Sequence, residues 1–213
     1  MSITESFFDQ LLATSVWEWL AVFLGVLYVI FAARKHIICW YFAFSSSAIY
    51  VFICVNYQLY IESGLQLFYV AMAIVGWYSW RKAPSNSPQG DLLDEVVIDQ
   101  KNDIKVWALS KHVINISVSG AIAIALGYFF SVYTNQANPY MDAFTTIFSL
   151  AATFMVTQKV LENWIYWVII DLVSIYLYSE RGLQLSAVLY AIFTVLAVFG
   201  FVSWYKHYKR QRA

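Results

Sequence analysis

The chain has 213 residues, of which 61% are hydrophobic, 19% aromatic and only 12% charged, and its formal net charge is zero. A soluble globular domain averages about 45–50% apolar and about 25% charged residues. Water therefore cannot be the solvent for most of this surface, and we expect an all-α membrane protein. The balanced charge, without a basic aromatic patch, also argues against nucleic-acid binding. Cys39 and Cys54 lie in one apolar segment with no metal-binding spacing.

Seven apolar segments follow one another along the chain, and each is close to the length of about 17–25 residues that a membrane-spanning helix needs. They lack the alternation of a β-barrel strand, so helices are the expected structure. The predicted segments are residues 17–33, 37–56, 64–80, 108–131, 141–157, 162–179 and 183–205. In the fourth, small residues recur every four positions, which predicts close packing against another helix. They form two stripes, Ser119, Ala123 and Gly127, and Ser117, Ala121 and Ala125.

The basic residues predict the orientation of these segments. With seven crossings, twelve of the thirteen Lys and Arg residues fall on one side of the membrane and Arg181 alone on the other. The positive-inside rule makes the first side the cytoplasm. The N-terminus is then outside and the C-terminus inside. The acidic N-terminus, with no Lys or Arg before Arg34, argues against a cleaved signal peptide.

The sequence contains two copies of one pattern, separated by 124 residues. Lys35, Trp40, Gly76, Ser79, Trp80 and Glu18 recur as Lys159, Trp164, Gly200, Ser203, Trp204 and Asp142. Three helices, one linking helix and three more helices place both copies in the same orientation, a known plan for transporters. The predicted units are a first repeat (1–80), a cytoplasmic linker (81–106), a linking transmembrane helix (107–133) and a second repeat with a basic tail (134–213).

The sixth segment carries the most informative polar residues. In QKVLENWIYWVIIDLVSIYLY (158–178), helical spacing places Asn163, Trp164, Trp167, Asp171 and Ser174 on one side. A carboxylate at bilayer depth is costly and normally faces a bundle interior or a wet cavity. Tryptophan faces attract rings and cations. These features predict a pocket for a small, flat solute that can be cationic.

Other interpretations of the same residues stay open at this point. Asp171 can pair with a neighbouring helix or be protonated by burial. Trp164 can belong to an interfacial belt, and Asn163 can cap its helix. Further candidate contacts, for which packing is the alternative, are Trp40, Ser47, Gln66, Tyr69, Tyr190 and Thr194. Ser47 is the position equivalent to Asp171, so the two copies differ in chemistry.

Motifs for catalysis and ATP hydrolysis are missing from the sequence. It contains no HExxH, GxSxG or Walker loop, and its three histidines lie at segment edges. We therefore expect neither an enzyme nor a bound cofactor or metal. A lone intramembrane acid without a basic partner is a poor proton relay, so facilitated diffusion is the expected mechanism.

The string KVLENWIYWVIIDLVSIYLY, together with GWYSW at 76–80, resembles the Pnu-type vitamin transporters, which include the PnuC nicotinamide riboside and PnuT thiamine transporters. The resemblance implies a bacterial inner-membrane protein with a 3+1+3 bundle similar to the sugar-transporting SWEETs, assembled as a homotrimer. It implies that the WxxW motif, Trp164 and Trp167, lines the pocket together with Asn163. It also implies that a cytoplasmic kinase traps the vitamin by phosphorylation.

The resemblance leaves the substrate open. Nicotinamide riboside carries a pyridinium and thiamine a thiazolium, and both are flat cations that suit tryptophan faces and a carboxylate. Two further hypotheses remain: a SWEET-like sugar transporter, and a membrane receptor that transports nothing.

Overall fold

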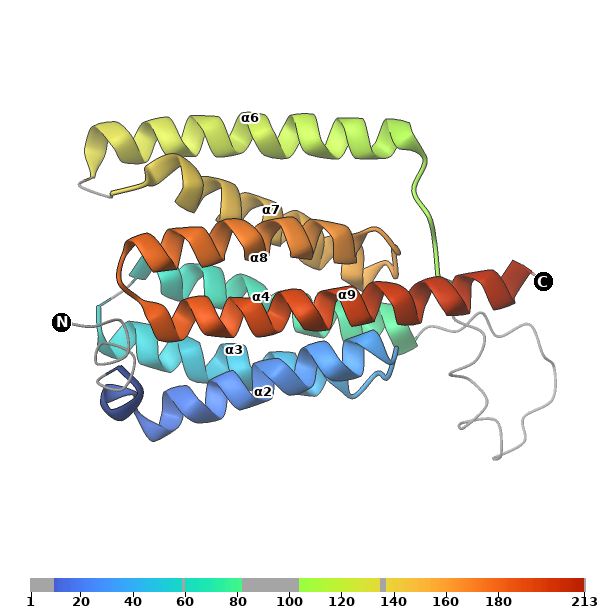
Figure 1. Cartoon of the computed structure of the whole chain (residues 1–213), viewed down its shortest axis with the longest axis horizontal. Helices are drawn as coiled ribbons and strands as arrows, with labels where there is room; N and C mark the ends of the chain where they lie inside the picture. The colour runs from blue at the N-terminus through green and yellow to red at the C-terminus, as the bar shows by residue number, and fades with distance from the viewer. Residues whose placement is uncertain (1–9, 59, 82–103, 135–136, 213) are drawn as a thin grey trace.

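The computed structural model describes residues 10–58, 60–81, 104–134 and 137–212. This part of the chain forms seven long helices that run along one common axis (Figure 1). They are α2 (Val16–Ala33), α3 (Cys39–Asn56), α4 (Tyr60–Arg81), α6 (Leu109–Tyr133), α7 (Pro139–Thr157), α8 (Asn163–Glu180) and α9 (Gln184–Arg212).

All seven predicted segments are helical, with small differences at their ends. Helix α4 begins at Tyr60, four residues before the predicted start, and α9 continues to Arg212 instead of ending at 205. The tail of α9 is rich in Lys, Arg and Gln, which are good helix formers, and cations are favourable near a helix C-terminus. Most of the predicted cytoplasmic linker, residues 82–103, lies outside the described residues.

Five of these helices, α2, α3, α6, α7 and α9, are long and apolar enough to cross a membrane. Helices α4 and α8 carry more polar side chains. In α8 these include Asn163, Asp171 and Ser174, all of which are buried inside the protein. Because neighbouring helices cover these groups, α8 does not need a fully apolar surface. The chain is a multi-pass, all-helical membrane protein.

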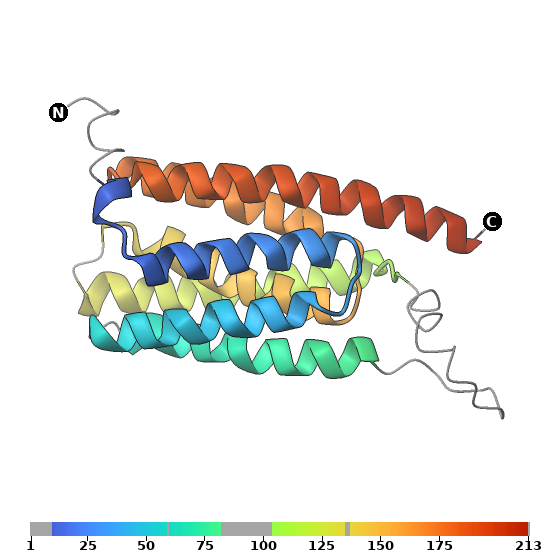
Figure 2. The same cartoon turned by 90° about the horizontal axis from the view of Figure 1, so that it is seen from below.

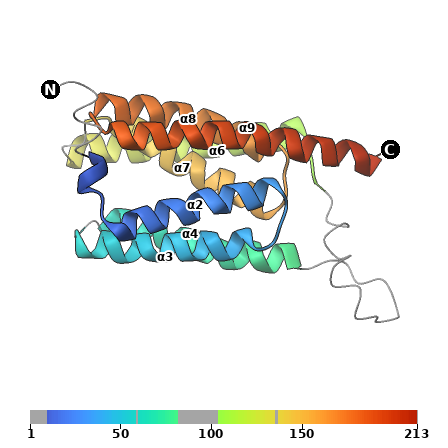
Figure 3. The same cartoon turned by 60° about the horizontal axis from the view of Figure 1, so that its bottom comes forward.

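The helices form two units of three. In the first unit α2 packs on α3 and α3 on α4, and in the second α7 packs on α8 and α8 on α9. The two units meet along two seams, α4 with α7 and α2 with α9. Figure 3 shows them as two layers, and Figure 2 shows that their helices stay nearly parallel.

Helix α6 packs along α7 at the edge of the bundle (Figure 1). Its buried residues are Ser119, Ala123 and Gly127, which confirms one of the two predicted packing stripes, whereas Ser117, Ala121 and Ala125 are exposed. A methyl group at Gly127 would lie only 2.5 Å from the ring of Tyr140 on α7. The small side chains therefore allow the two helices to approach closely.

Helices α2 and α7 end in the same way. Lys35 and Lys159, 124 residues apart, both have left-handed backbone conformations, with φ of 57° and 56°. The amide of Lys35 donates to the carbonyl of Ala32 at 2.9 Å, and that of Lys159 donates to Val156 at 3.0 Å. A left-handed residue after the last turn commonly ends a helix, although glycine is its usual occupant. The next helix begins four residues after each of these lysines, α3 at Cys39 and α8 at Asn163.

Candidate functional site

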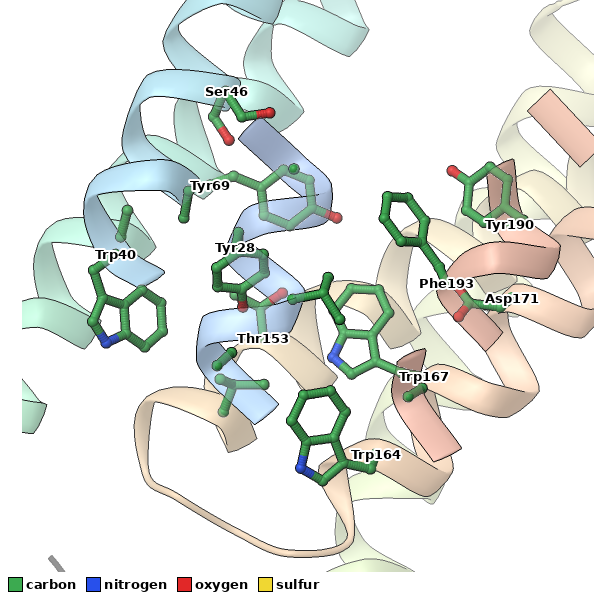
Figure 4. A pocket seen from close by; sticks show the side chains of 18 residues that line it. Tyr28, Trp40, Ser46, Tyr69, Thr153, Trp164, Trp167, Asp171, Tyr190 and Phe193 are labelled. Atoms are coloured by element: carbon green, nitrogen blue, oxygen red, sulfur yellow. The ribbon is translucent and has the colours of Figure 1, made fainter. Parts of the chain in front are cut away.

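A cavity of about 220 Å³ lies between the two three-helix units. Figure 4 shows its side chains, which come from α2, α3, α4, α7, α8 and α9, whereas α6 contributes none. The residues that line it are Gly25, Tyr28, Val29, Ala32, Trp40, Ala43, Ser46, Ser47, Tyr69, Ala73, Thr153, Val156, Trp164, Trp167, Asp171, Tyr190, Phe193 and Ala197.

Most lining positions occur in pairs that are 124 residues apart in the sequence. The pairs are 29 and 153, 32 and 156, 40 and 164, 43 and 167, 47 and 171, 69 and 193, and 73 and 197. The chemistry of the pairs is unequal, since Ala43 corresponds to Trp167 and Ser47 to Asp171. The lining positions of the two units therefore correspond to each other. The side formed by α8 differs from the side formed by α3 because it carries an acid and an additional tryptophan.

Asp171 is the only charged side chain among the lining residues. It is 2% exposed and forms no ion pair with any described residue. In Figure 4 it lies beside Phe193 and Tyr190, across the cavity from Trp40. A buried carboxylate without a partner is costly unless it is protonated or meets a donor or cation. Asp171 is thus available to a solute with a positive charge or a hydrogen-bond donor.

Two tryptophans of α8 contribute flat surfaces next to this acid. Trp164 is 3% exposed, so its ring lies inside the bundle and not at the lipid-facing surface. It packs edge-on against Trp204, with ring centroids 5.4 Å apart. Trp167 is half-buried and lies one turn closer to Asp171 (Figure 4). A planar ring bound here can stack on one indole while a donor group reaches the carboxylate.

Several hydroxyl groups around the cavity already have partners. The Ser46 hydroxyl donates to the carbonyl of Ala21 at 2.8 Å, and the Thr153 hydroxyl donates to that of Ser149 at 2.7 Å. The Tyr69 hydroxyl shares a 2.8 Å hydrogen bond with the Ser149 hydroxyl. The Ser46 and Tyr69 hydroxyls join neighbouring helices, whereas Thr153 bonds within α7. Besides Asp171 and Ser47, the buried indole nitrogens of Trp40 and Trp164 have no hydrogen-bond partner among the described residues, so these donors are also available to a solute.

The structure separates the predicted site residues into two groups. Seven of them line the cavity: Trp40, Ser47, Tyr69, Trp164, Trp167, Asp171 and Tyr190. Four lie outside its lining: Asn163, Ser174, Gln66 and Thr194. Asn163 is fully buried at the start of α8, where its amide donates to the carbonyl of Val160 at 2.6 Å. The Thr194 hydroxyl donates to the carbonyl of Tyr190 at 2.9 Å.

Sequence reasoning missed three prominent lining residues, Tyr28, Thr153 and Phe193. The spacing of 124 residues contained a signal for one of them, because Phe193 is the position equivalent to Tyr69. Tyr28 has no such signal, since Ala152, its equivalent, does not line the cavity.

The sequence pattern of the nicotinamide mononucleotide transporter family matches residues 15–206. The chain belongs to this family. It is 25% identical over 193 residues to the nicotinamide riboside transporter PnuC of Escherichia coli, covering 84% of this chain and 81% of that one. It is 26% identical over 210 residues to PnuC of Neisseria mucosa, covering 91% and 74%. Over 150 residues it is 25% identical to the riboflavin/roseoflavin transporter RibM of Streptomyces davaonensis, covering 70% and 66%.

The fold also has a solved counterpart. A crystal structure of the vitamin B3 transporter PnuC matches with a TM-score of 0.70 at 21% sequence identity, covering 98% of this chain and 90% of that one. At this identity the likeness shows the fold alone. The family match confirms the predicted resemblance, and the relatives are transporters, which agrees with the prediction that the chain is not an enzyme.

Proposed function

We propose that this protein takes up a cationic, ring-containing vitamin or vitamin precursor, with nicotinamide riboside first and thiamine second. The observation that carries the proposal is the cavity in which Trp164, Trp167 and the unpaired Asp171 lie together. Two of the relatives compared above are nicotinamide riboside transporters, which favours that substrate.

The chemistry of the cavity argues against phosphorylated substrates. Its lining contains no Lys, Arg or His, and its one charge is the acid Asp171. A phosphate group would lose its water without gaining a cationic partner, and the acid would repel it. Drug-sized ligands occupy pockets of about 300–1,000 Å³, so a cavity of about 220 Å³ suits a solute of one or two rings.

We further propose that the bundle is a 3+1+3 arrangement of parallel repeats similar to that of the SWEETs, with α6 as the linking helix. The equivalent turns at Lys35 and Lys159 and the paired lining positions support this proposal. Substrate crosses by facilitated diffusion in each protomer of a homotrimer in the bacterial inner membrane. The N-terminus is outside and the C-terminus in the cytoplasm, where a vitamin kinase traps the product by phosphorylation.

The decisive experiment is a binding titration of nicotinamide riboside and thiamine in parallel, followed by tryptophan fluorescence. We expect quenching by one of them that is lost in Trp167→Ala, and no response to nicotinamide mononucleotide or thiamine phosphate. Trp17→Ala is the matched control, because Trp17 is 60% exposed on the outer face of α2. Binding of neither vitamin by the folded protein would refute the proposal.

The two alternatives make different predictions in the same assays. A SWEET-like sugar transporter would carry glucose or sucrose, and its flux would not depend on Asp171. A receptor that transports nothing would release no vitamin from loaded vesicles, even if it bound one.

A further inference from the structure

Four tryptophans form a continuous layer at one end of the cavity. Trp40 packs edge-on against Trp80 with centroids 5.3 Å apart, and Trp164 packs in the same way against Trp204 at 5.4 Å. Trp80 and Trp204 meet in the middle, at 6.1 Å. We call these four residues the tryptophan layer. It lies at the end of the bundle where the basic tail of α9 extends beyond the other helices (Figure 1).

The layer stands between the cavity and this end of the protein. Trp40 and Trp164 line the cavity, whereas Trp80 and Trp204 lie behind them and do not. Trp204 has no exposed surface, and Trp80 is 3% exposed. A solute that leaves the cavity in this direction must therefore displace the four rings.

Two hydrogen bonds fasten the layer across both seams between the three-helix units. The indole nitrogen of Trp80 on α4 donates to the carbonyl of Val156 on α7, at 3.2 Å. The indole nitrogen of Trp204 on α9 donates to the carbonyl of Ala32 on α2, at 3.0 Å. These carbonyls are the ones that also accept the turn amides of Lys159 and Lys35. Each seam thus contains the same type of hydrogen bond, from a tryptophan of one unit to a carbonyl near a helix end of the other unit.

Two other contacts strengthen the α4–α7 seam. The hydroxyl of Ser79 donates to the carbonyl of Thr157 at 2.9 Å, one residue beyond the Trp80 bond. The ammonium group of the buried Lys159 lies 4.6 Å from the centroid of the Trp80 ring, within the range of a cation–π contact.

The rings have little space in which to turn aside while the units stay together. A methyl group at Gly76 would overlap the ring of Trp40, and one at Gly200 would lie 2.7 Å from that of Trp164. Both rings therefore rest directly on the backbone of the neighbouring helix. Passage of a ring-sized solute requires α4 to part from α7, or α9 from α2.

We infer that the tryptophan layer is a gate of the transport path, and that it opens when the indole–carbonyl bonds of Trp80 and Trp204 break and the two units separate. Trp80 and Trp204 act as positioning residues, which control exit without touching the bound solute. The inference rests on the proposed function only in requiring that some solute passes, and it does not depend on which one.

The chain contains a native reporter for this gate. Of its two cysteines, Cys39 has no exposed surface and belongs to the same buried cluster as the four tryptophans. Cys54 lies near the other end of the same helix, α3. Cys54→Ala leaves Cys39 as the reporter of the layer, and Cys39→Ala leaves Cys54 as a matched reporter away from it.

The experiment measures the rate at which N-ethylmaleimide modifies each cysteine in the purified full-length protein, without substrate. Trp80→Phe and Trp204→Phe keep an aromatic ring but remove the donor, and each lost bond is expected to raise Cys39 modification roughly fivefold. Cys54 modification should not change. Trp17→Phe, on α2 and 60% exposed, is the control for the substitution itself.

Unchanged Cys39 modification in both variants would overturn the inference, and so would an equal rise at Cys54, which would indicate general loosening. If either variant does not fold, Ser79→Ala removes a bond of the α4–α7 seam without loss of a ring, and it should raise Cys39 modification in the same direction. Because no vitamin is needed, failure to bind nicotinamide riboside or thiamine would leave this result interpretable.

Discussion

Replacing Gly200 by alanine tests how the wall of the cavity is positioned. The added methyl group would lie 2.7 Å from three atoms of the Trp164 ring, whereas ordinary contacts begin near 3.4 Å. The ring or the helix must therefore move by at least about 0.7 Å. Trp204 blocks one side of the ring, because it packs edge-on against it at 5.4 Å. The movement available to Trp164 is toward the cavity, where it would reduce the space for a solute.

Overpacking of a tight interior typically costs about 1–3 kcal/mol. If the shifted Trp164 ring destabilises the vitamin-bound protein by this amount, Gly200→Ala weakens vitamin binding by a factor of roughly 5 to 150. If overpacking instead destabilises the folded protein whether or not vitamin is bound, the variant unfolds at a lower temperature. Equilibrium binding and thermal unfolding in detergent, measured on the same sample, separate the two effects.

Gly120→Ala on α6 is the control for this substitution, because its methyl group would meet no atom within 4 Å. Alanine is the better helix former by about 0.5–1 kcal/mol, so this variant should be at least as stable as the parent protein. If Gly200→Ala binds the vitamin and unfolds like the parent, then Gly200 and Trp204 do not confine the Trp164 ring.

Three further predictions concern charged and polar residues. Asp171→Asn should weaken binding of the vitamin cation by a factor of roughly 10 to 150, the usual range for a hydrogen bond to a charged group, and titration calorimetry would detect it; unchanged affinity would contradict the role of this carboxylate. The double variant Ser47→Asp/Asp171→Ser moves the carboxylate from α8 to the matching position on α3. It should recover part of the vitamin binding that is lost in Asp171→Ser alone. No recovery would show that the α3 and α8 sides of the cavity are not equivalent. Asp142→Asn breaks a partly exposed 2.6 Å ion pair with Arg181. Thermal unfolding should show that the free energy of unfolding falls by only about 0–1 kcal/mol. A much larger decrease would contradict the view that this ion pair contributes little to stability.

The helices themselves could be read from the sequence because the membrane is their solvent. A span must be apolar over a fixed length and must satisfy its own backbone hydrogen bonds, so each of the seven segments carries its own signal. The matched pairs at a spacing of 124 residues were also visible, among them Trp80 and Trp204. In the structure these two make the same bond at the two seams.

Only some of the residues that line the cavity could be predicted from the sequence. Helical spacing places Asn163, Trp164 and Asp171 on one side of α8, and Trp164 and Asp171 do line the cavity. Asn163 lies outside the lining, because it begins the helix at the turn and bonds to Val160 there. One helix face is broad enough to contact two neighbours, so the spacing alone does not say which neighbour each residue meets.

Length, apolarity and periodicity thus determined which segments are helices and, in α8, which side carries the polar residues, since these properties depend on residues close together in the chain. The tertiary structure decided which side chains share a space. Tyr28 of α2, Trp40 of α3 and Phe193 of α9 reach one cavity only because the two units pack against each other along α2–α9 and α4–α7. Contacts of this kind depend on how whole helices pack, and that information is spread over the entire chain.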